Sequence, residues 1–294
     1  MKPYTLEWNG YRLELGAKTC VMGILNTTPD SFSDGGRFFD LDSALSQGEK
    51  LVAEGADILD IGGESTRPFS EGVSEEEELR RVIPVIEKLA PRISIPISID
   101  TTKASVAKKA VAAGAAIIND VSALRLDPEM AVVAAAAGVP VILMHMLGSP
   151  QTMQVSPVYD DLLGEIHSFL ESAINTAVKN GIKKSRLIAD PGIGFGKTVD
   201  HNLFLLKHLN DLESLGVPLL IGPSRKAFIR TVLKGNSDPE VTPDMPIVEI
   251  GTQAAVAAAA LSGAHIVRVH DVAHTCATVK IIDAVRQAAL PDQA

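Results

Sequence analysis

Eight short runs of almost wholly apolar residues constrain the fold of this chain more than any other feature. They alternate with longer segments in which apolar residues recur at helical spacing. Because each run is continuously apolar rather than alternating, it is typical of a parallel strand covered on both faces. The runs span residues 20–25, 56–61, 95–99, 115–118, 139–144, 187–189, 217–221 and 265–269.

The segments between the runs predict helices and carry the usual start and stop signals. Asp42 is a candidate N-cap, and Ser74 to Glu77 reads as a capping box. Glycine ends several of these segments just before the next run, as in an αβ connection. The helices are predicted over 41–56, 74–89, 101–113, 127–137, 160–180, 200–215, 246–262 and 271–289, and the glycines are Gly114, Gly138, Gly181, Gly216 and Gly263.

Eight strand and helix pairs with no break in composition predict a (β/α)₈ TIM barrel, an α/β fold. The alternative is a doubly wound open sheet. Residues 5–15, interrupted by Asn9-Gly10, predict an antiparallel β-hairpin. We therefore expect one domain over residues 1–294, in which residues 1–17 form a short N-terminal hairpin extension.

Charge and cysteine content exclude several classes of protein. The 294 residues include 27 Lys plus Arg and 36 Asp plus Glu, a net charge of −9, so the surplus of cations that nucleic-acid binding needs is absent. Cys20 and Cys276 are too few for a disulfide framework. The apolar window 130–147 contains Gly138-Val139-Pro140, which indicates a helix followed by a strand rather than a membrane span. The opening residues lack a signal-peptide pattern, so we expect a cytoplasmic protein with no membrane or nucleic-acid partner.

Polar or glycine residues follow nearly every apolar run, at the point where each strand would end. In a barrel these carboxyl ends meet at one mouth, where the active sites of this fold are built. Any one of them alone could be an ordinary turn or helix cap, but their recurrence at all eight ends predicts a pocket. They include Asn26, Thr66 and Arg67, Asp100, Asn119, His145, Asp190, Ser224 and Lys226, and Arg268 and His270.

The chemistry of these residues falls into two groups. Arg67, Lys226, Arg268 and His270 place cations in an acidic protein and suit an anionic ligand such as a diphosphate. Asp100, Asn119 and Asp190 offer carboxylate and amide groups that can pair with the edge of a planar heterocycle.

Each group also has a simpler explanation. Asp190-Pro191-Gly192 could be only a turn, Arg268 could pair with Asp271, and His270 could be a buried histidine with a satisfied ring. The stretch 192–198 resembles a phosphate-binding P-loop, but Pro191 replaces its first glycine. Cys20 and Cys276 lie at the wrong end of the barrel and within the last helix, so neither is expected to be a nucleophile.

Long motifs in a fixed order carry a resemblance to a known family. Across essentially its whole length the chain resembles dihydropteroate synthase. The matching stretches are residues 23–36 (GILNTTPDSFSDGG), 60–68 (DIGGESTRP), 98–101 (SIDT), 118–120 (IND), 144–146 (MHM), 190–197 (DPGIGFGK), 224–226 (SRK) and 268–271 (RVHD).

The resemblance implies that para-aminobenzoate displaces diphosphate from hydroxymethyl-dihydropterin diphosphate. It assigns the pterin to Asp100, Asn119, Met144, Asp190 and Lys226, with Asp100 and Lys226 as catalytic residues. It also implies a homodimer inhibited by sulfonamide mimics of para-aminobenzoate. Its remaining assignments are Asn26 for Mg²⁺, Arg268 and His270 for diphosphate with Thr66 and Arg67 nearby, and Phe195, Ser224, Phe32 and Pro68 around para-aminobenzoate.

Two other functions compete with this one. A pterin-binding methyltransferase that passes a methyl group from methyltetrahydrofolate to a corrinoid would share the barrel and the ring-binding carboxylates. It would not need a diphosphate-binding group, so Asn26, Arg67, Arg268 and His270 together argue against it. A catalytically silent relative that only binds pterin would have lost some of those residues, and this chain retains them.

Overall fold

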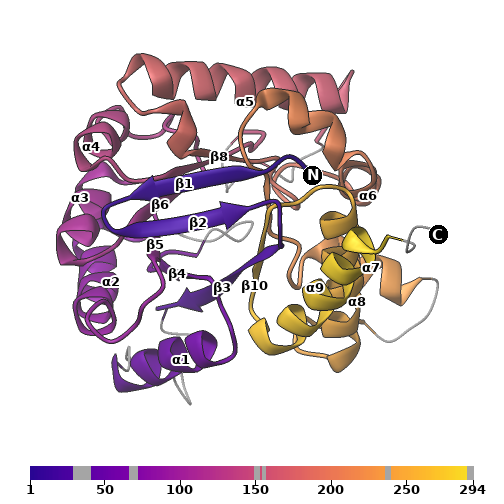
Figure 1. Cartoon of the computed structure of the whole chain (residues 1–294), viewed down its shortest axis with the longest axis horizontal. Coiled ribbons are helices and arrows are strands. Elements are labelled where there is room, and N and C mark those ends of the chain that lie inside the picture. The colour runs from indigo at the N-terminus through magenta and orange to yellow at the C-terminus, as the bar shows by residue number, and fades with distance from the viewer. Residues whose placement is uncertain (29–40, 66–71, 149–152, 154–156, 236–239, 290–294) are drawn as a thin grey trace, which may run out of the picture.

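The eight predicted strands form one parallel sheet that closes on itself almost completely, as seen in the computed structural model (Figure 1). The model describes residues 1–28, 41–65, 72–148, 153, 157–235 and 240–289. The strand order is β8-β7-β6-β5-β4-β3-β10-β9. The strands are β3 Cys20–Asn26, β4 Ile58–Gly62, β5 Ile97–Asp100, β6 Ile117–Asp120, β7 Val141–Met144, β8 Leu187–Asp190, β9 Leu220–Ile221 and β10 Ile266–Val269.

The two end strands of this order also meet. The backbone N–H of Ala189 donates to the carbonyl of Pro218 at 2.9 Å, and Ala189 forms an isolated parallel bridge with Leu219. These contacts join β8 to the start of β9, and the sheet becomes a barrel rather than an open sheet. The predicted TIM barrel is therefore confirmed and the doubly wound alternative is wrong.

Helices follow the strands and cover the outside of the barrel, where their apolar faces pack on the strands. No helix in the part of the chain that the structure describes is long and apolar enough to cross a membrane. The helices are α1 Leu41–Ala53, α2 Glu75–Leu89, α3 Ala104–Ala113, α4 Met130–Ala137, α5 Leu162–Lys179, α6 Val199–Lys207, α7 Ala227–Lys234, α8 Pro246–Leu261 and α9 Val272–Gln287.

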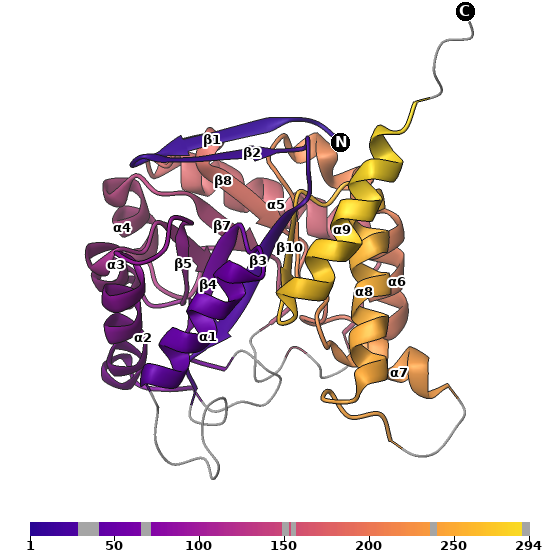
Figure 2. The same ribbon diagram turned by 60° about the horizontal axis from the view of Figure 1, so that its bottom comes forward.

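The predicted hairpin, formed by β1 Tyr4–Trp8 and β2 Tyr11–Leu15, covers one end of the barrel (Figure 2). Asn9 and Gly10 both have positive φ, as a tight two-residue turn requires. The Trp8 indole is buried and donates to the carbonyl of Ala116 at 2.7 Å, which attaches the hairpin to the base of β6. This end is therefore plugged, and the carboxyl ends of the strands lie at the opposite end.

Several predicted helix boundaries were wrong in detail. Asp42 lies in the first turn of α1 rather than at its N-cap. Ser74 does cap α2, since its side chain accepts from the N–H of Glu77. The capping box is incomplete because the Glu77 carboxylate binds Arg80 and Arg81 instead of the Ser74 backbone. The helix predicted over 200–215 breaks at His208, and a 3₁₀ segment covers Leu209–Leu215. The short helix α7 was not predicted.

Candidate active site

Strand register brings the predicted residues to the mouth of the barrel. Asp100, the last residue of β5, lies opposite Gly62 on one side and Asn119 on the other. Met144, the last residue of β7, lies opposite Asp190 at the end of β8. Because parallel strands in register present the same end together, these residues share one mouth of the barrel. The carboxyl ends of the strands lie at the end away from the hairpin (Figure 2).

An ion-pair network surrounds Arg268 at the mouth. Its Nε donates to Asp60 at 2.6 Å, and its Nη2 donates to Asp100 at 2.7 Å. The Arg268 side chain is only 21% exposed, so both pairs lie in a region of weak solvent screening. The alternative pairing with Asp271 is wrong, since Asp271 caps α9 and binds His274 instead.

Asp60 is the functional candidate that the sequence analysis missed. It lies within β4, fully buried, and its Oδ2 also accepts from Asn119 Nδ2 at 3.2 Å. A single carboxylate inside an otherwise apolar strand was the available signal. The two groups predicted from sequence are therefore not separate: Asp60 connects Arg268, predicted to bind an anion, to Asn119, predicted to bind a ring.

Burial alters the ionisation of Asp100 and Asp190, the two carboxylates predicted to bind the ring. Desolvation raises the pKa of Asp190 to about 6, although the N–H of Gly192 and the ammonium of Lys226 oppose this rise. Desolvation also raises the pKa of Asp100 well above its usual range; Arg268 lowers it, and the nearby charge of Asp60 adds to the rise. Both carboxyl groups are thus tuned to titrate closer to neutrality than an exposed aspartate.

The Asp190-Pro191-Gly192 segment is both a turn and part of the site. Gly192 has positive φ, and its N–H donates to Asp190 Oδ1 at 2.7 Å. Beyond this turn, the ammonium of Lys226 lies 4.0 Å from the centroid of the Phe195 ring, a cation–π contact. Phe195 and Met144 belong to a small buried apolar cluster that could form the walls of a pocket for a flat ring.

His270, Ser224 and Asn26 lie around the same mouth. His270 follows β10, and its Nδ1 lies 2.9 Å from Ser224 Oγ. Asn26 is half-buried at the end of β3, opposite Gly62. Thr66 and Arg67, like Phe32 and Pro68, lie outside the described residues.

Lys197 has a structural role, in agreement with the prediction that residues 192–198 are not a phosphate-binding P-loop. It is buried, and its Nζ contacts His145 Nδ1 and the carbonyl of Phe195, each at 3.0 Å. Burial, together with the charge of Lys197, lowers the pKa of His145 to about 2, so its imidazole is neutral and accepts this bond. The contacts hold the Gly192–Lys197 segment against β7.

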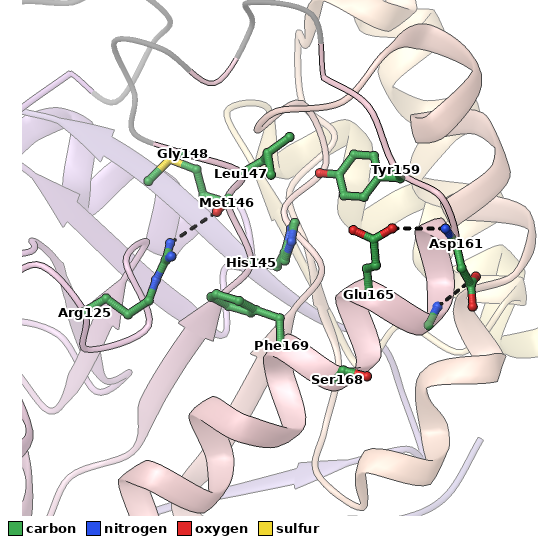
Figure 3. A pocket seen from close by; sticks show the side chains of 11 residues that line it. Arg125, His145, Met146, Leu147, Gly148, Tyr159, Asp161, Glu165, Ser168 and Phe169 are labelled. Carbon is green, nitrogen blue, oxygen red and sulfur yellow. Dashed lines mark hydrogen bonds between the residues drawn. The ribbon is translucent and has the colours of Figure 1, made fainter.

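A separate pocket of about 570 Å³ lies between α5 and the segment after β7 (Figure 3). Its polar groups are used within the protein: Arg125 donates to the carbonyl of Met146, Tyr159 donates to that of Gly196, and Glu165 accepts from the N–H of Asp161. Of the polar residues predicted at the strand ends, His145 lines it, but none of the residues to which a substrate was assigned does, so the mouth of the barrel remains the candidate site.

The described residues of the site could hold Mg²⁺ together with oxygen atoms of a ligand. Among the described residues, no group of three or more His, Cys, Asp or Glu side chains could hold a metal ion. Asn26 offers one amide oxygen. Mg²⁺ typically takes one or two protein oxygens and completes its octahedron with substrate phosphates and water. The donor set fits a magnesium ion that arrives with a diphosphate.

Comparisons with known proteins agree with this geometry. Residues 22–270 match the family model for pterin binding enzymes. The dihydropteroate synthase of Synechocystis is 49% identical over 92% of this chain and 91% of that protein. The structures of the Yersinia pestis enzyme with a sulfonamide drug and of the Xanthomonas albilineans enzyme with 4-aminobenzoic acid each superpose with a TM-score of 0.89 at 46% identity. They cover 97% and 98% of this chain, and all of each solved chain.

The TIM barrel and the residues at its mouth are those of a pterin-binding enzyme. The chain belongs to the dihydropteroate synthases, the transferases of folate synthesis within that family.

Proposed function

We propose that the mouth of the barrel joins para-aminobenzoate to hydroxymethyl-dihydropterin diphosphate, forming dihydropteroate and releasing diphosphate. One observation carries the proposal: Arg268 is held between Asp60 and Asp100 at the same mouth as Asn119 and Asp190. A cation suited to a departing diphosphate thus lies beside groups suited to the edge of a planar ring. The 4-aminobenzoic acid bound to the Xanthomonas albilineans relative supports the second substrate.

The proposed pterin site consists of Asp100, Asn119, Asp190, Lys226 and Met144. Carboxylates accept from ring N–H and exocyclic amino groups, while an ammonium can donate to a ring carbonyl or nitrogen. Met144 is buried and supplies an apolar surface under the ring. This division of polar edges and an apolar face is usual in sites for flat heterocycles.

Arg268 and His270 would bind the diphosphate, with Thr66 and Arg67 as further donors. Ser224 and Phe195 would contact para-aminobenzoate, together with Phe32 and Pro68. Ser224 lies at hydrogen-bond distance from His270, so the proposed subsites for the amine and the leaving group adjoin each other. Such adjacency is what a displacement needs, because the attacking and departing groups must both reach one carbon.

The proposed chemistry requires no protein nucleophile. An arylamine is neutral at working pH and carries a free lone pair, so the barrier lies in expelling diphosphate and tolerating positive charge on the pterin methylene. Arg268 and His270 would stabilise the departing negative charge, and Asp100 would offset the developing cation. Magnesium, held by Asn26 and the diphosphate, would supply additional positive charge to the leaving group.

A direct assay separates this proposal from its rivals. The purified protein is incubated with the pterin diphosphate, Mg²⁺ and para-aminobenzoate, and diphosphate release is followed. We expect release that depends on the amine. A pterin-binding methyltransferase would instead release nothing here and would transfer a methyl group from methyltetrahydrofolate. A silent pterin-binding protein would bind the pterin and do neither.

Metal removal tests the role of Asn26. Chelation should stop diphosphate release, and added Mg²⁺ should restore it. Replacing Asn26 with alanine should raise the Mg²⁺ concentration needed for half-maximal rate by at least about tenfold, because even indirect partners of a metal contribute that much to its affinity. The exposed Asn180, at the end of α5, provides a matched control whose alanine variant should keep the normal requirement. An unchanged requirement in Asn26→Ala would remove Asn26 from the metal site.

The pH profile follows from the two buried carboxyl groups. In the free enzyme, kcat/KM for the pterin diphosphate should fall as the pH is lowered through about 6, where Asp190 becomes protonated. The raised pKa of Asp100 should extend this fall to higher pH. The sign follows because protonation removes the negative charge that we propose binds the ring. An acid limb near pH 4, typical of exposed aspartates, would contradict this role.

We also propose a homodimer formed through the last two helices. The helices α8 and α9 lie side by side (Figure 1). Each carries apolar side chains that remain exposed: Ile247, Ile250 and Leu261 on α8, and Ile281 and Val285 on α9. Exposed apolar side chains on two neighbouring helices are candidates for an interface. Sedimentation equilibrium should give twice the 31.1 kDa mass of the chain.

The cytoplasm is the location we propose. Cys20 and Cys276 are both free thiols, which is usual in a reducing compartment. Fractionation of cells that express the protein should recover it with cytoplasmic enzymes.

A further inference from the structure

We propose that Asp60 is a positioning residue for the reaction, one that sets the direction of both the Arg268 guanidinium and the Asn119 amide. The inference rests on the proposed roles of these two residues in binding the pterin diphosphate. Asp60 itself is fully buried, beneath the mouth, and would touch neither substrate.

The burial of Asp60 is hard to explain by stability alone. Its neighbours in β4, Leu59 and Ile61, are apolar and equally buried. Asp60 Oδ1 has no hydrogen-bond partner in the described part of the chain, which adds a desolvation cost to that of burying the charge. Well-packed apolar side chains often stabilise a core at least as well as a buried ion pair. A role beyond packing therefore accounts better for a carboxylate here.

The first contact of Asp60 fixes the guanidinium in two directions. Asp60 holds Arg268 Nε, and Asp100 holds the Nη2 on the other arm. Because two of its nitrogens are hydrogen-bonded, the planar guanidinium cannot rotate about the bond that joins it to the rest of the side chain. When Asp100 binds the ring, its hydrogen bond to Arg268 weakens. The 2.6 Å bond between Arg268 Nε and Asp60 then keeps the guanidinium at the mouth.

The second contact fixes the polarity of an amide. Asn119 Nδ2 donates to Asp60 Oδ2, so the Asn119 carbonyl oxygen is the end turned away from Asp60. That oxygen can accept from a ring N–H. If the amide were rotated by half a turn, the Asn119 oxygen would face the Asp60 carboxylate. Both groups are acceptors, so this orientation is unfavourable. One buried side chain thereby prepares an acceptor for the ring and a cation for the diphosphate.

The test is Asp60→Asn, which keeps the shape but removes the charge and one acceptor. We expect the Kd for the pterin diphosphate, measured by calorimetry with Mg²⁺, and its KM to rise roughly 10- to 100-fold, as loss of charge-assisted hydrogen bonds predicts. The KM for para-aminobenzoate should stay within about twofold, since its proposed subsite lies apart from Asp60. Asp60→Ser, which is smaller and also uncharged, should behave alike if the asparagine variant folds poorly.

The matched control is Asp283→Asn, at the opposite end of the barrel. Asp283 is also a buried aspartate paired with an arginine, Arg286, and it binds Thr19. Both asparagine variants should lower the melting temperature, but only Asp60→Asn should weaken pterin diphosphate binding. A purely structural Asp60 would give two variants with the same kinetics and binding as the unaltered protein, and this result would overturn the inference.

A double-mutant cycle separates this inference from the proposed function. Arg268→Gln alone should weaken binding of the pterin diphosphate; if it does not, the proposed role of Arg268 fails. If it does, Asp60→Asn should add less than about threefold in the Arg268→Gln background, because most of its effect acts through the arginine. Full additivity of the two changes would show that Asp60 does not act through Arg268, and the inference would fail while the proposed function stands.

Discussion

Replacing Arg268 with glutamine should lower kcat/KM for the pterin diphosphate about 1000-fold, since preorganised groups that stabilise a leaving charge contribute on this order. The variant loses the cation that we propose for the departing diphosphate. It should also lose about 3–5 kcal/mol in the free energy of unfolding, because removing one partner of a buried ion pair leaves the others uncompensated. Here two carboxylates, Asp60 and Asp100, lose their common partner. Steady-state kinetics and chemical denaturation measure the two effects.

Arg286→Gln is the control for this prediction. Arg286 pairs with Asp283 at the hairpin end and is about as buried as Arg268, with 18% of its side chain exposed against 21%. It also donates to the carbonyl of Gly16, so its loss should destabilise the fold as well. Its kcat/KM should remain within about twofold of the unaltered protein. Comparable kinetics in the two variants would mean that Arg268 is only a structural residue.

The fold was predictable because its signals are local. Continuously apolar runs such as 139–144 identify buried parallel strands without any knowledge of their partners, and Gly138 and Gly216 end helices through their left-handed backbone. Local signals failed where tertiary contacts decide. The helix predicted over 200–215 breaks at His208, and the eight residues of α7 are too few for a clear period.

The positions of the site residues were predictable, but their pairing was not. Polar residues at strand ends indicate a shared mouth in a barrel. Which of these residues touch depends on strand register and side-chain direction. The contacting residues can be about two hundred positions apart in the sequence, as Asp60 and Arg268 are. Asp60 itself was counted with an apolar run. The contact of Lys197 with His145 was equally hidden, since β7 and the Gly192–Lys197 segment meet only in the folded state.

In the proposed site, Asp100 is shared between ring binding and leaving-group binding. In the free protein its Oδ2 accepts from Arg268, at 2.7 Å, while its register neighbour is Asn119, which we propose binds the ring. A diphosphate that binds Arg268 competes with Asp100 for the guanidinium and leaves the carboxylate more available to the ring. We expect the two halves of the substrate to support each other's binding through this exchange.

Asp100→Asn should therefore lower turnover more than it lowers affinity for diphosphate. The substitution keeps the shape but removes the negative charge that we propose offsets the cation on the pterin methylene. The single-turnover rate should fall about 100- to 1000-fold, the range seen when one group that stabilises transition-state charge is removed. The Kd for inorganic diphosphate with Mg²⁺, measured by calorimetry, should change less than about tenfold, because Asp60 still holds Arg268.

Asp120→Asn distinguishes this effect from general damage at the mouth. Asp120 is buried in the next strand, one residue beyond Asn119, but its carboxylate accepts from the backbone N–H groups of Ser122 and Leu124. Its asparagine variant should lose stability and keep its single-turnover rate within about threefold. If Asp100→Asn turned over as fast as the unaltered protein, the carboxylate would have no part in the chemical step, and the developing cation would have to be stabilised by the ring alone.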